Sequence, residues 1–389
     1  MAFAELEPYS PPSSGEIPIL DVDRAASINR KHQLLAEYIS LKNVDGLLLR
    51  SPANFAWFTC GTENTRPGTL DPVAALFITR DVRVILTSNV DSSHIFDHQL
   101  NGLGFQVKER PWQEITGTLC NDMCRGRNVL YDTGPQSIDA ELQDFRRTLT
   151  DLEANRIRVL AREVTHAVEA TARSFNQGEN ESEVAGHLAH RLLRHGITPY
   201  RLQVMADFQG HRYRHWGFGT DTVNRHCVLS AVGRRNGLYV GVSRSVCFGQ
   251  PPASVVETHN AATLVLATAM HFSLAGWSIG ETWKRVHRIY EKFGVADEWR
   301  LADQGETLGY DQPGLTVRPD EPATLGSGTV VHWHPGVRFA LTGETVLVQP
   351  EGPEWLTIPD QWPMLGITVK GERHSFPDVL CRETGTGWE

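Results

Sequence analysis

The sequence predicts a two-domain protein in which a small α/β domain precedes a larger α+β domain. The chain has 389 residues, which is more than one ordinary domain contains. Its first part alternates short apolar segments with helical stretches, the pattern of an α/β domain with a mainly parallel sheet. Long helices and separate groups of strands follow, which is typical of an α+β domain. We expect an extended arm over 1–22, the α/β domain over 23–150 and the α+β domain over 151–389.

The elements of the first domain come from short apolar runs separated by helical stretches. Residues 1–22 are rich in Pro and Ser and have little periodicity, which predicts the arm. A helix is expected next, over 28–39. The strands are expected at 46–49, 74–78, 82–86 and 128–131, with helices near 92–102 and 112–125 between them.

In the second domain, helical spacing of apolar residues extends over 137–175, and a further helix starts after 178–182. Strands follow around 228–230 and over 238–248, and then helices over 254–275 and 278–293. Ser278 and Glu281 form a capping box at the start of the last helix. The chain ends in strands at 328–333, 345–348 and 367–369, so helices and strands are segregated as in α+β domains.

Composition excludes several classes of protein. A net charge of −9 lacks the basic face that neutralises phosphates, so no nucleic-acid partner is expected. No signal peptide is visible, and no apolar run approaches the roughly 18 residues of a membrane span, so we expect a cytoplasmic protein with no membrane partner. Six scattered cysteines are no disulfide framework. Cys120 and Cys124 lack a second pair and are expected to be ordinary helical thiols rather than a metal or redox site.

Five segments of the second domain together carry a resemblance to a known family. They are Gly178–Ala185, Gly233–Ser245, Gly305–Tyr310, His334–Gly336 and Gly343–Val348. Their order and spacing resemble the helix start, the Asp-x-Gly…Asp-x-Thr-Arg-Thr hairpin, and the Gly-His, Glu-Pro-Gly and Glu-Asp motifs of the creatinase, aminopeptidase P and prolidase family. Asn54–Gly61 likewise resembles a stretch of that family's N-terminal domain. The resemblance implies a creatinase-N-like α/β domain followed by a pita-bread domain.

Peptidases of that family hold two divalent metals with two Asp, one His and two Glu. Transferred by the resemblance, these ligands fall on Ser230, Gly241, Glu306, His334 and Gly343. Glycine has no side chain, and a serine hydroxyl is a poor ligand for a hard dication. We therefore expect neither a metal nor another cofactor. Creatinase, which has this fold without metals and hydrolyses a small guanidino compound, is the precedent for chemistry on such a scaffold.

Three residues are candidates for proton transfer without a metal. His215 lies in the loop 211–221, where the family carries a histidine on the substrate side, and imidazole titrates near neutral pH. The alternative is an exposed loop with solvated histidines. Glu306 and His334 replace two ligands that face each other, so a carboxylate would orient an imidazole. A buried structural hydrogen bond explains that pair equally well.

The expected substrate-binding residues are more dispersed. Arg212 and Arg214 lie in the same loop, and their guanidinium groups suit an anionic substrate, although solvated surface charge is the alternative. Tyr310 and Glu344 are further candidates, the tyrosine being as compatible with a core role. By the resemblance, Arg66 would reach the pocket of a second subunit in a homodimer. Arg244 is expected to pair within the sheet, as in the family.

Three functions remain open. The first is a metal-independent, creatinase-like hydrolase that cleaves a C–N bond of a small, anionic substrate. The second is a catalytically inactive pita-bread protein that binds a ligand or another protein. The third is an Xaa-Pro peptidase with an atypical metal site, which the missing ligands disfavour.

Overall fold

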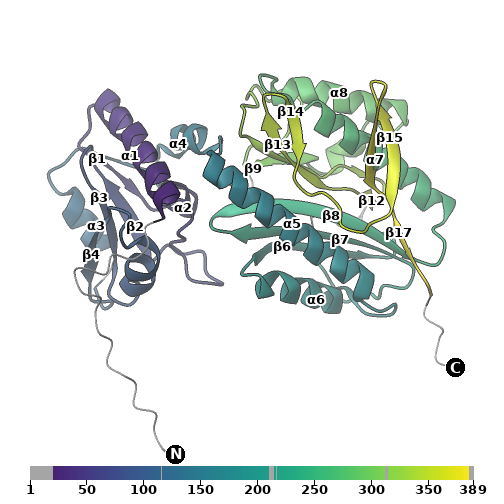
Figure 1. Ribbon diagram of the computed structural model, residues 1–389, viewed down its shortest axis with the longest axis horizontal. Helices are drawn as coiled ribbons and strands as arrows, with labels where there is room; N and C mark the ends of the chain where they lie inside the picture. The colour runs from purple at the N-terminus through teal and green to yellow at the C-terminus, as the bar shows by residue number, and fades with distance from the viewer. Residues whose placement is uncertain (1–20, 115, 210–213, 216, 312–313, 385–389) are drawn as a thin grey trace, which may run out of the picture. The chain divides into compact units, whose positions relative to one another are not determined.

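The computed structural model describes residues 21–114, 116–209, 214–215, 217–311 and 314–384. The chain divides into two compact units after Asp139, earlier than the predicted boundary at 150, so helix α4 (Asp139–Arg146) falls almost wholly in the second unit. The predicted arm lies outside the described residues except for its last two, and Val22 already begins helix α1 (Val22–Lys42). Both units contain strands and helices, as the predicted fold class requires (Figure 1).

The first unit contains a five-stranded sheet in the order β4-β3-β2-β1-β5. The strands are β1 (Gly46–Leu49), β2 (Ala74–Ile78), β3 (Arg83–Ser88), β4 (Gln106–Arg110) and β5 (Val129–Tyr131). The prediction of a mainly parallel sheet is wrong, because β1–β2 and β2–β3 are antiparallel while β1–β5 and β3–β4 are parallel. The four residues between β2 and β3 allow only a hairpin, whereas parallel neighbours need a longer crossover.

Helices α1, α2 (Pro52–Phe58) and α3 (Thr116–Cys124) and the π-helix η1 (Ser93–Leu100) accompany this sheet. The strand side chains of β1 and β2 are buried, and those of β3 almost entirely so. Such near-continuous apolar runs are typical of strands covered on both faces. Cys120 and Cys124 lie on α3 as free thiols.

The second unit begins with two long helices and a sheet. Helices α5 (Asp151–Ser174) and α6 (Glu181–Arg194) each begin with a capping box, and both pack against the sheet β17-β8-β7-β6. Its strands are β6 (Thr198–Ala206), β7 (His226–Arg235), β8 (Leu238–Phe248) and β17 (Leu380–Arg382). The predicted strand over 238–248 is confirmed at both ends, and its start follows directly from an Asn236-Gly237 turn in which both residues have positive φ.

Helices α7 (Ala253–His271) and α8 (Ile279–Lys292) cover the second half of the unit, and the predicted capping box of Ser278 and Glu281 is confirmed. The second sheet has the order β14-β13-β10-β9. Its strands are β9 (Gly305–Leu308), β10 (Val330–Trp333), β13 (Glu344–Gln349) and β14 (Gly352–Trp355). Two hairpins complete the unit: β11 (Gly336–Val337) with β12 (Ala340–Leu341), and β15 (Met364–Val369) with β16 (Glu372–Pro377).

The two sheets of the second unit meet where β8 approaches the start of β13. Ser243 and Gly343 form an isolated antiparallel bridge, and the Ser243 N–H donates to the Gly343 carbonyl at 2.9 Å. Nearby, the Thr345 hydroxyl contacts both backbone groups of Gly241. This junction brings the residues of β7, β8, β9, β10 and β13 together. Among the described residues, no helix is long and apolar enough to cross a membrane.

Candidate active site

A small pocket lies at the junction of the two sheets. It is lined by residues of β6, β7 and β12, of the loop between β6 and β7, and of the segments just before β9 and just after β10: Arg201, Gln203, Arg214, His215, Ser230, Ala302, Asp303, His334 and Leu341. Its volume of about 10 Å³ corresponds to about one water molecule. Three residues predicted from the sequence, His215, His334 and Arg214, therefore meet in one place.

Asp303 connects the two predicted histidines. The His215 Nε2 atom lies 2.7 Å from Asp303 Oδ1, and the His334 Nε2 atom lies 3.6 Å from Oδ2 of the same carboxylate. The two imidazole rings are 6.2 Å apart and nearly perpendicular. Glu306 is the second carboxylate, with its Oε1 atom 3.9 Å from His334 Nε2. The expected juxtaposition of Glu306 and His334 is therefore present, at a separation longer than a hydrogen bond.

Burial controls the protonation of this group. Desolvation lowers the pKa of His334 to about 4, although Glu306 and Asp303 act against it, so the imidazole is neutral at pH 7. Burial raises the pKa of Asp303, but the hydrogen bond with His215 and the neighbouring imidazoles outweigh it and lower the pKa well below its usual range. The His334 Nε2 atom is buried and finds no hydrogen-bond partner among the described residues. The site thus holds an ionised carboxylate beside a neutral imidazole.

Both arginines of the pocket already have carboxylate partners. Arg201 donates to Glu306 Oε1 at 2.8 Å, and Glu306 is buried. Arg214 donates to Glu298 at 2.7 Å and to the Arg338 carbonyl at 3.2 Å. The buried Nε atoms of Arg201 and Arg214 find no hydrogen-bond partner in the described part of the chain. The positive charge of the two arginines is therefore largely compensated by carboxylates. Their two buried Nε–H donors remain without a partner among the described residues.

The residues at the transferred metal-ligand positions do not fit a dimetal centre. His332, paired in register with Glu306 on β9, lies fully buried over Gly241. A Cβ atom at Gly241 would lie 2.5 Å from His332 Nε2, and one at Gly343 would lie 2.5 Å from Ser243 Oγ. Imidazole and hydroxyl groups therefore fill the space that two carboxylate side chains would need.

The other residues at these positions, Ser230 and Glu306, are also unsuited to binding a metal ion. The Ser243 hydroxyl donates to Ser230 Oγ at 2.9 Å, and Glu306 accepts from Arg201. A guanidinium group on a carboxylate opposes the binding of a dication to it. Within the described residues, the one set of three His, Cys, Asp or Glu ligand atoms all within 4.8 Å of one another lies elsewhere. The donor set supports no reaction step through metals at this site.

His332 itself has a defined orientation. Its Nδ1 atom is 3.2 Å from the Glu344 carbonyl, which only accepts, so Nδ1 carries the proton. The Nε2 atom then presents its lone pair, and it has no hydrogen-bond partner among the described residues. Desolvation and the neighbouring His334 and Arg201 lower the pKa of His332 well below its usual value. The rings of His332, on β10, and His334, directly after it, lie 5.1 Å apart.

Two predicted substrate-binding residues have structural partners instead. The Glu344 carboxylate is buried and accepts from Arg244 at 2.6 Å, from Trp355 at 3.0 Å and from Thr357. Burial raises the pKa of Glu344 in spite of these donors. Tyr310 is buried and donates to Glu153 at 2.8 Å. Neither residue lines the pocket.

The expected structural role of Arg244 agrees with its contacts, because it also donates to buried Glu169 at 2.8 Å. Arg66 lies in the first unit and forms an exposed ion pair with Asp91 at 2.9 Å, so its contribution to a second subunit stays a prediction. Arg212 lies outside the described residues.

The sequence interpretation missed three residues of the site. His332 has a recognisable signal, because it precedes His334 by two residues at the end of a predicted strand, and residues two apart in extended chain share a face. Arg201 and Asp303 have none, since Arg201 lies on a strand that was not predicted and Asp303 lies in an irregular segment before β9. Only the packing of the two sheets brings them to the pocket.

Comparison with known proteins identifies the fold. No protein-family model matches the chain, and no curated protein matches it. Among solved structures, the prolidase from Thermococcus sibiricus is similar with a TM-score of 0.73 and 16% identity, over 86% of this chain and 97% of that one. The prolidase from Pyrococcus horikoshii OT3 is similar with a TM-score of 0.72 and 14% identity, over 87% of this chain and 99% of that one.

The X-Pro aminopeptidase from Thermotoga maritima MSB8 gives a TM-score of 0.68 with 16% identity, over 85% of this chain and 98% of that one. The resemblance seen in the sequence motifs is thereby confirmed for the fold. The similarity extends over almost the whole length of each of these enzymes, so it includes both units. The chain therefore has the two-domain pita-bread fold of prolidases and X-Pro aminopeptidases.

Proposed function

We propose that this chain is a metal-independent hydrolase in which His334 acts as general base on a water molecule in the pocket. One observation carries the proposal. The His334 imidazole is neutral because its pKa is lowered to about 4, its Nε2 atom has no hydrogen-bond partner among the described residues, and its side chain lines a cavity with room for about one water. A neutral imidazole beside water is the arrangement that general-base catalysis needs.

Asp303 and His215 complete the acid–base group. The Asp303 carboxylate accepts from His215 at 2.7 Å and lies beside His334, so it would stabilise the imidazolium that forms when His334 takes a proton. His215 is partly exposed and, in its protonated form, would donate a proton to the leaving amine; the proton taken by His334 would then pass to His215 and restore both groups. Cleavage then breaks a C–N bond, adds the water's hydroxyl to carbon and leaves the proton on nitrogen.

The substrate class is inferred from two N–H donors of the pocket arginines, since the arginine charges already have carboxylate partners. Arg201 and Arg214 line the pocket, and each keeps an Nε atom without a partner among the described residues. These N–H donors favour the binding of a small molecule with a carboxylate group, because the planar guanidinium group matches the geometry of a carboxylate. A substrate larger than water must displace pocket side chains on binding. The predicted homodimer belongs to the same proposal, and light scattering on the purified chain would test it.

A panel of small carboxylates tests this function. Guanidino acids, ureido acids, N-acyl amino acids and Xaa-Pro dipeptides are incubated with the full chain before and after chelator treatment, and products are followed by proton NMR. We expect turnover that survives the chelator and falls by about 10²- to 10⁴-fold in His334→Gln. His166→Gln, which changes an exposed histidine of α5 paired loosely with Asp360, is the matched control. Turnover that disappears with chelator and returns with Mn²⁺ contradicts metal independence.

The closed state of the pocket supports a second candidate, a binding protein without catalysis. Its volume is about 10 Å³, and its arginines are bonded to Glu306 and Glu298. A pseudoenzyme of this kind would bind a partner while turning over none of the panel. Saturable binding of a panel member that is unchanged in His334→Gln, without product, would favour this candidate.

A further inference from the structure

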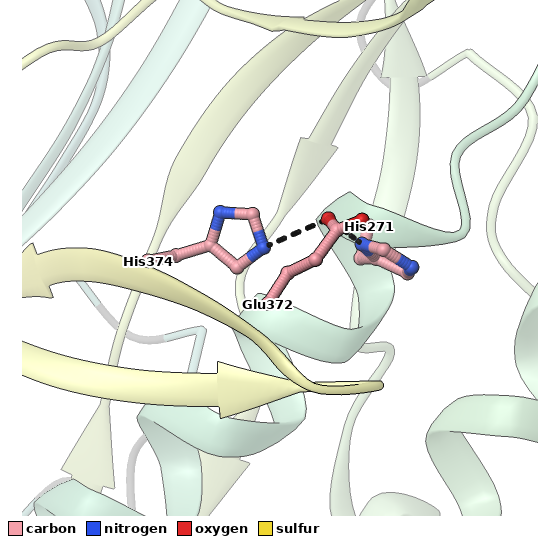
Figure 2. A group of neighbouring side chains, drawn as sticks. All are labelled: His271, Glu372 and His374. Atoms are coloured by element: carbon pink, nitrogen blue, oxygen red, sulfur yellow. Dashed lines mark ion pairs between the residues drawn. The ribbon is translucent and has the colours of Figure 1, made fainter.

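A second group of ligand atoms lies in the second unit, in contact with a different cavity. His271, Glu372 and His374 bring one ligand atom each within 4.8 Å of one another. In Figure 2 the Glu372 carboxylate lies between the two imidazoles. Its Oε2 atom is 3.9 Å from His271 Nδ1 and 3.7 Å from His374 Nε2. None of these residues lines the pocket of His334.

The backbone positions these three side chains independently of any metal. Lys370 and Gly371, both with positive φ, make the two-residue turn between β15 and β16, which fixes the register of the hairpin. Glu372 and His374 are two residues apart on β16 and so share one face. His271 is the last residue of α7, which packs against both strands of the hairpin.

The donor set selects the kind of metal. Two imidazoles and one carboxylate suit Zn²⁺ and its first-row neighbours, whereas Mg²⁺ and Ca²⁺ prefer oxygen ligands throughout. Tetrahedral Zn²⁺ with bonds of about 2.0–2.1 Å places its ligand atoms about 3.3 Å apart. The two carboxylate–imidazole separations must shorten by about half an ångström, and the separation of the imidazole nitrogens by at most about 1.5 Å, which rotations of these partly exposed side chains can supply.

Two features distinguish the group from exposed side chains that merely lie near one another. The His374 Nε2 atom is buried and has no hydrogen-bond partner in the described part of the chain, although it faces the Glu372 carboxylate. All three residues also line a groove of about 830 Å³, whose walls include Met270, Trp355 and Phe376. A groove of this size accommodates a small-molecule ligand.

We propose that His271, Glu372 and His374 form a Zn²⁺ site with its fourth coordination position open to this groove. Three protein ligands with one position left for water or a bound molecule is the arrangement of catalytic zinc sites, whereas structural sites have four protein ligands. This inference is independent of the hydrolase proposed above, because the two groups share no residue.

Metal titration tests the site directly. The full-length chain is stripped with a chelator, dialysed and titrated with Zn²⁺ alone against a chromophoric competitor. We expect one Zn²⁺ per chain, with affinity falling by at least about 10-fold in Glu372→Gln and in His374→Gln. His334→Gln and His166→Gln should leave the affinity unchanged. X-ray absorption of the zinc-loaded protein should show imidazole scattering and a first shell at about 2.0–2.1 Å.

A loss of zinc affinity in these variants can be distinguished from a loss of folding stability. Glu372 has a side-chain exposure of 68% and lies beside the hairpin turn, so Glu372→Gln should unfold at the same temperature as the unsubstituted chain in chelator. Zn²⁺ should raise the unfolding temperature of the unsubstituted chain and not of Glu372→Gln. Zinc affinity that is unaffected by both substitutions, or that is lost in His334→Gln, overturns the proposal.

Discussion

Adding a single methyl group at Gly241 should destabilise the second unit, because His332 occupies the required space. The Cβ of an alanine would lie 2.5 Å from His332 Nε2 and 2.6 Å from two of its ring carbons. The ring cannot move freely, since Nδ1 bonds the Glu344 carbonyl and the neighbouring cavity measures only about 10 Å³. Overpacking of this kind costs about 1–3 kcal/mol. For a unit of this size, that lowers the unfolding temperature by roughly 2–12 °C.

A double-mutant cycle separates the clash from other effects. His332→Ala removes the ring and should cost stability on its own, but Gly241→Ala should then cost little or nothing. We expect a coupling energy of about 1–3 kcal/mol in favour of the double variant, measured by denaturant unfolding followed in the second unit. Gly186→Ala is the control, because a Cβ at this helical glycine meets nothing within 4 Å. It should stabilise by up to about 1 kcal/mol.

Two results would refute this reasoning. One is a Gly241→Ala variant as stable as the unsubstituted chain. The other is additivity of Gly241→Ala and His332→Ala, which would mean that the two residues do not compete for space. Gly241→Asp extends the test, because it restores the carboxylate that the family resemblance assigns to this position. It should destabilise more than alanine, since it adds a buried charge to the clash.

Three further predictions concern the buried ionisable side chains of the second unit. The lowered pKa of His334 means that the unfolded chain takes up a proton before the folded one, so stability should fall as pH drops from about 6.5 to about 4. His334→Gln should flatten that acid slope by up to about 3 kcal/mol in pH-dependent denaturant unfolding. Arg244→Met should cost about 3–5 kcal/mol by leaving two buried carboxylates without their guanidinium, and Arg244→Lys should restore only part, as calorimetry would show. Arg201→Met should destabilise through Glu306, and adding Glu306→Gln should recover stability; a double variant no better than Arg201→Met in the same melts would contradict this.

The positions of the main helices and strands could be predicted from local patterns of apolar and capping residues in the sequence. The strands over 46–49, 74–78 and 238–248 have the predicted bounds, and the helix at Ser278 begins with the predicted capping box. These features depend on apolar periodicity and on contacts within a few residues, which a single sequence displays directly. The direction of the first sheet's strands was predicted wrongly, because pairing depends on connections across the whole unit.

The sequence motifs also identified the fold, and they indicated His215, Arg214 and His334, which the structure brings to one pocket. What surrounds these three residues depended on the tertiary structure. Asp303 and Arg201 reach the pocket only because two sheets meet at Ser243 and Gly343, far apart in the chain. Side-chain packing likewise decided that the Glu344 carboxylate accepts a hydrogen bond from Arg244 instead of lining the pocket.

The sequence by itself determined that Gly241 and Gly343 offer no metal ligands, since a residue's donor atoms are part of its identity. Only the tertiary structure decided that His332 fills the space above Gly241 and that burial keeps His334 neutral. The physical reason is that excluded volume and desolvation are properties of the packed environment, and residues distant in sequence create that environment.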